Sequence, residues 1–260
     1  LVKGRYFDRV VIINLENRNY AAVQSSPYWQ ELAQRGRLLS NYNDITHPSQ
    51  PNYVAQIFGS TDGVFFDFKS SVKGRNLVDL LEEKRVSWKA YMENYPGGPD
   101  NCFKESNNDD KLYRRKHNPF MVAENVREEP ARCAKIVNAD QFERDLGSGS
   151  LPQYSYYTPN MNNDGHDTSL EYATNWLKAF LEPKLADPNF TRRTLIVVTF
   201  DEAENYLIRN QVYTVLLGEA AGRKGTVDDS EYNHYSLLRT VEDNWGLGTL
   251  KRNDAEAKPF

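Results

Sequence analysis

The sequence predicts an α/β fold, a three-layer sandwich with a mostly parallel central sheet. Short apolar runs typical of buried strands alternate along the chain with stretches typical of helices, and this alternation favours parallel pairing. The strongest strand signal is residues 193–200 (RTLIVVTF), a continuous β-branched run expected in a sheet covered on both faces. With 260 residues and 39% hydrophobic content, the chain is expected to form one domain spanning residues 1–260.

The other predicted strands are apolar runs that end at polar residues. The first is residues 9–15 (RVVIINL), which is followed by Glu16 and Asn17. In the same way, Asp201 and Glu202 follow the strand at 193–200. Ligands bind at the carboxyl ends of strands in open α/β sheets, so these ends are where a site is expected. Further strands are predicted at 37–42, 87–92, 153–157 and 212–217.

Helices are predicted where capping residues or a one-sided apolar pattern mark them. Ser26 and Gly36 bracket residues 27–35 as an N-cap and a stop signal. Pro51 fits the first turn of a helix at 49–58, where its missing N–H costs nothing. The polar stretch at about 94–150 is expected to be an insertion with short helices near the site. The remaining helices are predicted at 76–84, 169–181 and 234–245.

Charge and hydropathy exclude several classes of partner. The net charge is −4 and the sequence pI is about 5.7, so no global basic surface predicts a nucleic-acid partner. The sequence contains no run of about 18 apolar residues, so no membrane-spanning helix is expected. Nothing in the sequence indicates an obligate protein partner. The chain begins with Leu, which we interpret as a processed chain from which a signal peptide has been removed.

Two cysteines, Cys102 and Cys133, lie in the polar middle stretch without metal-binding spacing. Their loop-like flanks, with no core pattern around either cysteine, favour a disulfide, and two free thiols are the alternative. Asn189 begins an N-glycosylation sequon. These features together favour a secreted or extracellular protein.

The pairs Glu16-Asn17 and Asp201-Glu202 are candidate cation ligands. Adjacent carboxylates that follow an apolar run are costly to bury unpaired, so they either lie at the surface or bind a cation. Their oxygens suit hard cations, and we predict one divalent ion, Mg²⁺, Ca²⁺ or Mn²⁺. Such an ion would offset the charge of a phosphoryl group.

Ser49 is the candidate nucleophile, because the free N–H groups at the start of its helix favour an anion there. A serine beside a metal can ionise without a histidine base. The alternative is that Ser49 only caps the helix. Capping leaves Asn52, one turn later, unexplained, and we interpret Asn52 as a phosphate donor.

All four histidines lie in polar, motif-like strings. Imidazoles around a phosphate can donate to its oxygens and protonate a leaving group, so we assign His117 and His166 as catalytic. Most single histidines are merely satisfied core or surface residues, and His234 could equally cap the last helix. His47 and His234 are placed with the substrate-binding groups, together with Asn52 and Asp164.

The strings ENRNY, HPSQPNY, RKHNPF, NDGHD, TFDE and NHYSLLRTVED resemble the successive motifs of the phosphoesterase family that contains bacterial phospholipases C and metal-dependent acid phosphatases. The resemblance covers about residues 7–248 and is strongest to compact acid phosphatases. It implies an alkaline-phosphatase-like fold and a phosphoserine intermediate. It places Ser49 at the nucleophile position, and Asn52, His117 and His166 near the phosphate with Asp164 beside them. It places the metal on five residues. The five implied ligands are Glu16, Asn17, Ser49, Asp201 and Glu202.

The family often has two Asp residues where this chain has Asp201 and Glu202, so the role of Glu202 is open. The chain ends soon after its last helix and lacks the large C-terminal region of many phospholipases C, which favours phosphomonoesters as substrates. The resemblance thus implies a metal-dependent acid phosphatase acting on small-molecule phosphate esters. One alternative is a phosphodiesterase or phospholipase C-like hydrolase. A second is a metal-dependent binding protein on a degenerate scaffold.

Overall fold

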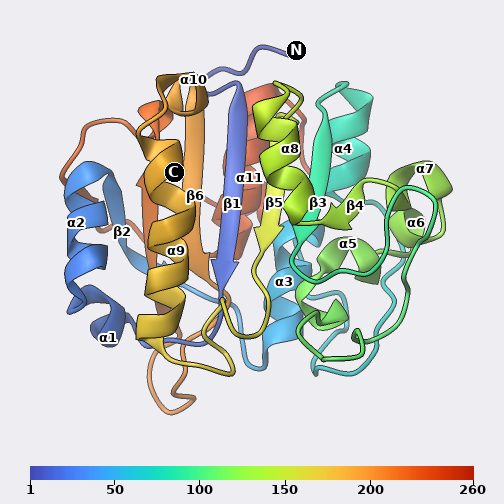
Figure 1. Cartoon of the computed structure of the whole chain (residues 1–260), viewed down its shortest axis with the longest axis horizontal. Coiled ribbons are helices and arrows are strands. Elements are labelled where there is room, and N and C mark those ends of the chain that lie inside the picture. Colours follow the sequence, from blue (N-terminus) through green and yellow to red (C-terminus); the bar gives the residue numbers. More distant parts are fainter.

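A computed structural model describes residues 1–260 and contains one eight-stranded sheet with the strand order β4-β3-β5-β1-β6-β7-β2-β8 (Figure 1). Most neighbouring strands are parallel, and β7 is antiparallel to both β6 and β2. The expected mostly parallel α/β sheet is therefore confirmed. The strands are β1 (Arg9–Leu15), β2 (Arg37–Asn43), β3 (Trp88–Met92), β4 (Ile136–Asn138), β5 (Tyr154–Thr158), β6 (Thr194–Phe200), β7 (Gln211–Leu217) and β8 (Thr226–Asp228).

Helices cover both faces of the sheet and complete the three layers (Figure 1). One face is covered by α1 (Tyr20–Gln24), α2 (Pro27–Arg35), α8 (Asp140–Gly147) and α9 (Leu170–Leu185). The opposite layer contains α3, α4, α5 and α11. The helices of this layer are α3 (Ser49–Phe58), α4 (Leu77–Glu83), α5 (Pro119–Val122) and α11 (His234–Trp245). The remaining helices are short: α6 (Glu124–Arg127), α7 (Pro130–Cys133), α10 (Pro188–Thr191), α12 (Asn253–Glu256), η1 (Arg115–His117) and η2 (Glu219–Ala221).

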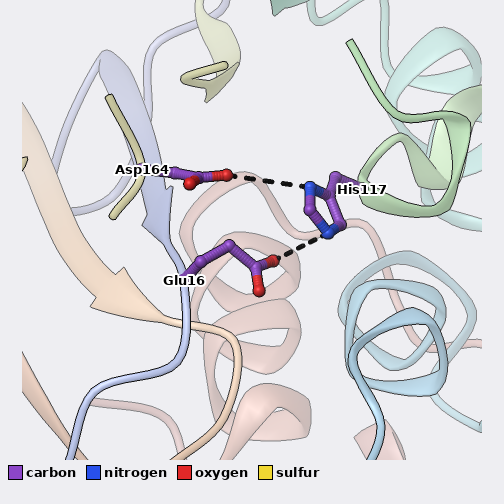
Figure 2. Close-up of side chains that lie close together, drawn as sticks. All are labelled: Glu16, His117 and Asp164. Carbon is purple, nitrogen blue, oxygen red and sulfur yellow. Dashed lines mark ion pairs between the residues drawn. The ribbon is translucent and has the colours of Figure 1, made fainter. Parts of the chain in front are cut away.

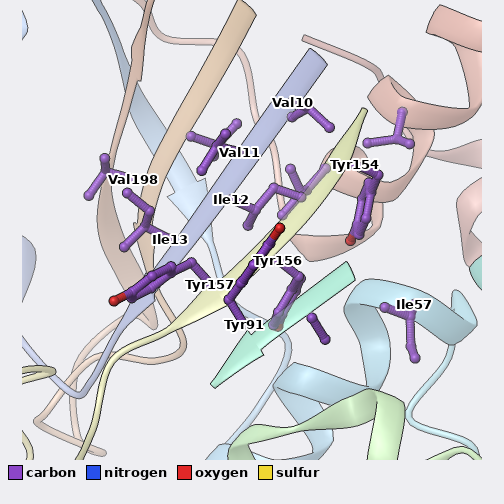
Figure 3. Close-up of a cluster of buried hydrophobic side chains, with 14 of the residues drawn as sticks. Val10, Val11, Ile12, Ile13, Ile57, Tyr91, Tyr154, Tyr156, Tyr157 and Val198 are labelled. Carbon is purple, nitrogen blue, oxygen red and sulfur yellow. The ribbon is translucent and has the colours of Figure 1, made fainter. Parts of the chain in front are cut away.

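The centre of the sheet is formed by its most apolar strands. Every residue of β6 is buried, as its β-branched sequence predicts. Strand β1 lies between β5 and β6 and is parallel to both. Figure 3 shows the side chains of β1 and β5 packed with neighbouring aromatic residues of the core. The carboxyl ends of β1, β5 and β6 therefore meet at one edge of the sheet.

The polar stretch at 94–150 contributes more to the layers than expected. Strand β4 lies inside it and pairs in parallel with β3 at the edge of the sheet. Helix α8 also lies inside it, and Phe142 of this helix packs against Tyr91 and Tyr157 of the sheet. The description of this stretch as an insertion with short helices was therefore incomplete. A three-residue strand is too short to show an alternating pattern in the sequence.

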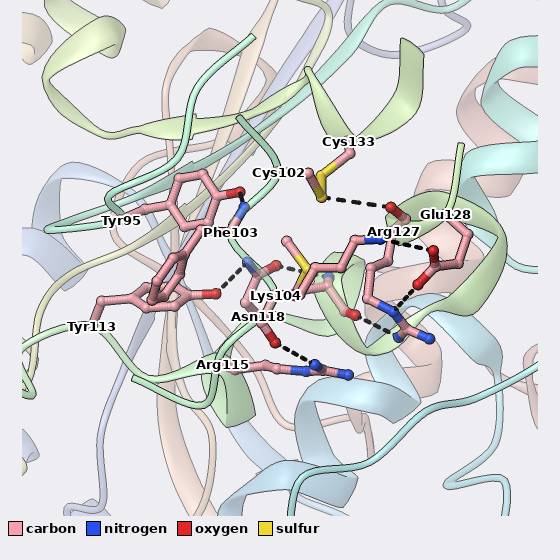
Figure 4. Close-up of a disulfide and its surroundings, with 11 residues drawn as sticks. Tyr95, Cys102, Phe103, Lys104, Tyr113, Arg115, Asn118, Arg127, Glu128 and Cys133 are labelled. Atoms are coloured by element: carbon pink, nitrogen blue, oxygen red, sulfur yellow. Dashed lines mark hydrogen bonds and ion pairs between the residues drawn. A yellow bond between two sulfur atoms is a disulfide. The ribbon is translucent and has the colours of Figure 1, made fainter. Parts of the chain in front are cut away.

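The predicted disulfide between Cys102 and Cys133 is confirmed (Figure 4). It joins the long loop before η1 to the end of α7, across 31 residues of chain. Contrary to the sequence analysis, Cys133 does belong to the hydrophobic core and is only 1% exposed. None of the helices has both the length and the apolar character that a bilayer-spanning helix needs.

Candidate active site

The register between β1 and β6 brings together the two polar pairs that follow these strands. Leu15 and Phe200 are paired in this register, and Asp201 N–H donates to the Leu15 carbonyl at 3.0 Å. Glu16 and Asp201 are consequently neighbours, although they are far apart in the sequence. Both side chains, and that of Glu202, are fully buried. Three buried carboxylates in one place need positive charge or protons to be stable.

Asn17 adds a fourth polar group to these carboxylates. One terminal atom of its side-chain amide lies 2.6 Å from Glu16 Oε2 and 3.0 Å from Asp201 Oδ1. If this atom is nitrogen, it donates to both carboxylates; if it is oxygen, the three oxygens form a face suited to a hard cation. The backbone of Asn17 has a φ of 30°, which is unusual for a non-glycine residue.

Ser49 joins the cluster from the first turn of α3. Its hydroxyl donates to Glu202 Oε1 at 2.8 Å and lies 3.3 Å from Glu16 Oε2. Pro48, not Ser49, occupies the N-cap position of α3. The side chain of Ser49 therefore points at the carboxylates instead of capping the helix.

The pKa of Glu16 is lowered within the cluster, whereas the pKa values of Asp201 and Glu202 are raised. Burial would raise the pKa of Glu16, but His117 and a 2.7 Å hydrogen bond from the Tyr53 hydroxyl lower it to about 2. Burial, opposed in part by the Ser49 hydrogen bond, raises the pKa of Glu202 to about 8. Burial and the charge of Glu16 raise the pKa of Asp201 as well. A bound cation would keep all three ionised.

A second group of ligand atoms lies on the other side of Glu16. His117 Nε2 is 3.0 Å from Glu16 Oε1, and His117 Nδ1 is 3.8 Å from Asp164 Oδ2 (Figure 2). All three side chains are buried, and their ligand atoms lie close enough together to hold a metal ion. Burial and the charge of Glu16 raise the pKa of Asp164. Glu16 thus belongs to two overlapping sets of potential ligands.

The side chains of His166 and His47 are less deeply buried than the carboxylates of the cluster. The side chain of His166 is 33% exposed, and its ring centre is 6.4 Å from that of His117. Asp164 Oδ1 accepts from the backbone N–H of His166 at 2.8 Å, which ties the two residues together. His47 pairs with Glu202 through Nδ1 and stacks on Tyr206.

His234 and Asn52 were expected to bind the substrate, but both side chains are bonded to other groups of the protein. His234 is fully buried behind Asp201, where its Nε2 lies 2.8 Å from Asp44 Oδ1 and 3.0 Å from the Asp201 carbonyl. It does not cap α11 with its side chain, because Asn233 does so. Both ends of the Asn52 amide bond to the backbone of residues 45–48. Asn52 therefore holds the loop that precedes Ser49 and has no free donor.

Two polar residues near the cluster were missed in the sequence analysis. Tyr53, which hydrogen-bonds to Glu16, lies within the HPSQPNY string and could have been found there. Asp44 is buried against His234, and burial raises its pKa to about 7 even though His234 opposes this. Nothing local in the sequence marks Asp44 as buried, because it follows a predicted strand in a polar stretch.

A model of the phosphoesterase family matches residues 17–248. The chain belongs to the phosphoesterase family. It is 43% identical to a probable acid phosphatase of Kluyveromyces lactis over 98% of this chain and 62% of that protein. It is 40% identical to a phosphate-repressible acid phosphatase of Penicillium chrysogenum over 98% of this chain and 63% of that protein. The chain thus spans less than two thirds of the length of these two relatives.

Another phosphoesterase relative has a different named substrate. This is a phosphatidylinositol-3-phosphatase of Mycobacterium tuberculosis, which is 34% identical over 93% of this chain and 78% of that protein. Among solved structures, a protein of the alkaline phosphatase superfamily from Vibrio parahaemolyticus aligns with a TM-score of 0.63 and 14% identity, over 98% of this chain and 70% of that one. The expected alkaline-phosphatase-like fold is confirmed.

Proposed function

We propose that this phosphoesterase is a metal-dependent phosphomonoesterase of the acid phosphatase type, with Ser49 as its nucleophile. The observation that carries the proposal is the position of Ser49. This residue is the first of α3, and its hydroxyl contacts the carboxylates of Glu202 and Glu16. The free N–H groups at the start of a helix favour a phosphate anion there. The relatives named acid phosphatases support the same activity.

The donor set fits a hard divalent cation. Five oxygen-bearing side chains are linked in series by contacts of 2.6, 2.8, 3.0 and 3.3 Å, and one oxygen of Asp201 has no partner. A bound cation would offset the negative charge of the phosphoryl group and of ionised Ser49. The Glu16–His117–Asp164 group is the second place where an ion could bind. The proposed ligands of the main site are Glu16, Asn17, Ser49, Asp201 and Glu202.

The proposed reaction has two displacement steps. In the first, Ser49 Oγ attacks phosphorus, its proton passes to Glu202 Oε1, and the bond from phosphorus to the ester oxygen breaks. The departing alkoxide takes a proton from His166, whose side chain is partly exposed. In the second step, water attacks phosphorus and gives a proton to His166, and the bond from phosphorus to Ser49 Oγ breaks. Ser49 Oγ takes back the proton held by Glu202, and phosphate leaves.

A generic monoester tests this function. The protein should hydrolyse p-nitrophenyl phosphate, lose activity after chelation, and regain it when Mg²⁺, Ca²⁺ or Mn²⁺ is returned. The diester bis(p-nitrophenyl) phosphate should be a much poorer substrate. Faster hydrolysis of the diester would favour the phosphodiesterase alternative, and tight phosphate binding without hydrolysis of either ester would favour the binding protein.

A second candidate substrate class, phosphate esters with an apolar body such as lipid phosphates, is favoured by two exposed loops at the same edge of the sheet (Figure 1). In the first loop, the carbonyls of Phe66 and Phe68 accept hydrogen bonds from the side chain of Gln50, the residue after Ser49. In the second loop, Tyr206 stacks on His47. Hydrolysis of a short-chain lipid phosphate faster than glycerol phosphate would support this class. The exposed apolar side chains of the loops are Phe65, Phe66, Phe68, Tyr206, Leu207 and Ile208.

We also propose that the protein is secreted. The protein contains a disulfide bond, Cys102–Cys133, and disulfide bonds persist in oxidising compartments such as the outside of the cell. Asn189, the first residue of the sequon, is exposed in α10, where a glycan could be attached. A mass increase that is removed by an endoglycosidase and is absent in Asn189→Gln would establish the modification.

A further inference from the structure

A small basic cavity of about 80 Å³ is lined in part by residues that adjoin Ser49 and His117 in the sequence. Four of its lining side chains are cationic, namely those of Lys69, Arg114, Arg115 and Lys116. The only acidic residue in its wall is Asp67, so the cavity has an excess of positive charge. This local charge contrasts with the net charge of −4 of the whole chain.

Two residues that line the cavity are neighbours in sequence of residues in the proposed site. Gln50, which lines the cavity, directly follows Ser49, and Lys116 directly precedes His117. Asp67 bridges the two segments, because its Oδ1 accepts from Gln50 N–H at 3.0 Å and its Oδ2 pairs with Lys116 Nζ at 3.0 Å. Adjacent Cα atoms are about 3.8 Å apart, so the backbone at Gln50 and Lys116 lies next to that at Ser49 and His117.

The cationic groups of the cavity are incompletely paired. Nε of Arg114 is buried without a hydrogen-bond partner, and its guanidinium forms no ion pair. Nε of Arg115 is also buried without a partner, although its two terminal nitrogens donate to the carbonyls of Lys104 and Ser70. Lys69 forms only an exposed ion pair with Glu105 at 3.3 Å. Buried donors without acceptors cost free energy unless a ligand supplies the acceptor.

We propose that this cavity is a subsite for a second anionic group, a phosphate or a carboxylate, on the ester whose phosphate is cleaved at Ser49. Guanidinium groups match the oxygens of phosphate and carboxylate in geometry and charge. The subsite rests on the proposed phosphomonoesterase function and narrows its substrate class to phosphate esters with a second negative charge. Arg114 is the main determinant of this preference, because it is the unpaired arginine of the cavity.

Matched substrates test the subsite through the ratio of their kcat/KM values. Fructose 1,6-bisphosphate is compared with fructose 6-phosphate for a second phosphate, and 2-phosphoglycerate with glycerol 2-phosphate for a carboxylate. Wild type should prefer the member with the extra anion in at least one pair. Arg114→Gln should lower this ratio about tenfold, since a charge-assisted hydrogen bond is lost, while leaving the reference substrate within about twofold.

Controls separate the subsite from general charge effects. Lys111→Gln removes the same charge from an exposed lysine outside the cavity and should leave the ratio unchanged. Lys69→Gln provides a second test at an exposed position if Arg114→Gln folds poorly. An unchanged ratio in both cavity variants, or no preference in wild type, overturns the subsite while leaving hydrolysis of the reference substrate intact.

The subsite also remains testable if no substrate is hydrolysed, a result that would instead sink the proposed function. Calorimetry then compares binding of the same two fructose phosphates to Ser49→Ala. Tighter binding of the bisphosphate that is lost in the Ser49→Ala, Arg114→Gln double variant supports the subsite. Equal binding of the two compounds refutes it.

Discussion

The hydroxyl of Ser49 lies 2.8 Å from Oε1 of Glu202, although 153 residues separate them along the chain. This contact joins the start of α3 to the end of β6 at the carboxyl edge of the sheet. It places a candidate nucleophile directly against a candidate base and ligand. Its functional meaning is open to direct tests.

Ser49→Ala should remove nearly all phosphomonoesterase activity while preserving the fold, because it removes the proposed nucleophile and only one oxygen atom of the side chain. The measurement is steady-state hydrolysis of p-nitrophenyl phosphate, with circular dichroism as the check of folding. Acid quenching during turnover should trap phosphate on wild type and not on the variant. Activity within about tenfold of wild type, a difference of only about 1.4 kcal/mol in the barrier, would contradict the assignment.

Asp201→Asn should lower the divalent metal content of the purified protein, because it replaces a buried carboxylate of the proposed ligand set. Elemental analysis after dialysis against a limiting cation measures the occupancy. Asp140→Asn, which changes an exposed carboxylate on α8, is the matched control. Full occupancy in Asp201→Asn would show that the ion lies elsewhere, and Glu16, His117 and Asp164 would then be the group to test.

His166→Ala and His117→Ala should each lower kcat much more than metal content. A general acid gives its proton to the departing alkoxide, so loss of either imidazole should slow the chemical step. The test uses an alkyl phosphate, whose poor leaving group depends most on protonation. Normal kcat in either variant on this substrate would be incompatible with the proposed roles.

Reduction of Cys102–Cys133 should lower the free energy of unfolding by about 3–4 kcal/mol, because the bond closes a 31-residue segment in the unfolded chain. Denaturant unfolding of Cys102→Ala, Cys133→Ala measures the effect. Thiol titration of the unreduced, denatured wild type should detect no free thiol. Two titratable thiols would show that the bond does not form in the protein tested.

Glu242→Gln should stabilise the protein at alkaline pH. Burial and the nearby carboxyl of Asp254 raise the pKa of Glu242 to about 10, and both of its oxygens lack partners. The folded state therefore binds more protons than the unfolded state. The stability that protonated Glu242 contributes is complete below its unfolded pKa of 4.5 and is lost as pH rises towards 10.

Urea unfolding at pH 5 and pH 8 tests this prediction in the presence of a chelator. The contribution of one group changes by at most about 1.4 kcal/mol per pH unit, and the wild-type decline should be smaller in Glu242→Gln. Glu256→Gln, at an exposed position of α12, should keep the wild-type dependence. An identical pH dependence in wild type and Glu242→Gln would rule out this role for Glu242.

Much of the fold could be predicted because its signals are local. The apolar run of β1, the β-branched run of β6 and the capping residues around α2 each lie within a few neighbouring positions. Element bounds were less certain where one signal was ambiguous. Helix α9 continues through Pro183 to Leu185, beyond the predicted end at residue 181, because packing of its apolar face outweighs the lost hydrogen bond.

For the candidate site too, some features could be predicted from local sequence and others depend on the tertiary structure. The sequence by itself determined which residues are chemically capable, since Glu16, Ser49 and Asp201 stand at the ends of recognisable elements within family-like strings. Only the tertiary structure decided which of them meet. The pairing of Leu15 with Phe200 sets Glu16 beside Asp201, and the fold turns His234 away from the site towards Asp44. Long-range register and burial depend on the packing of the whole chain, and no local pattern encodes them.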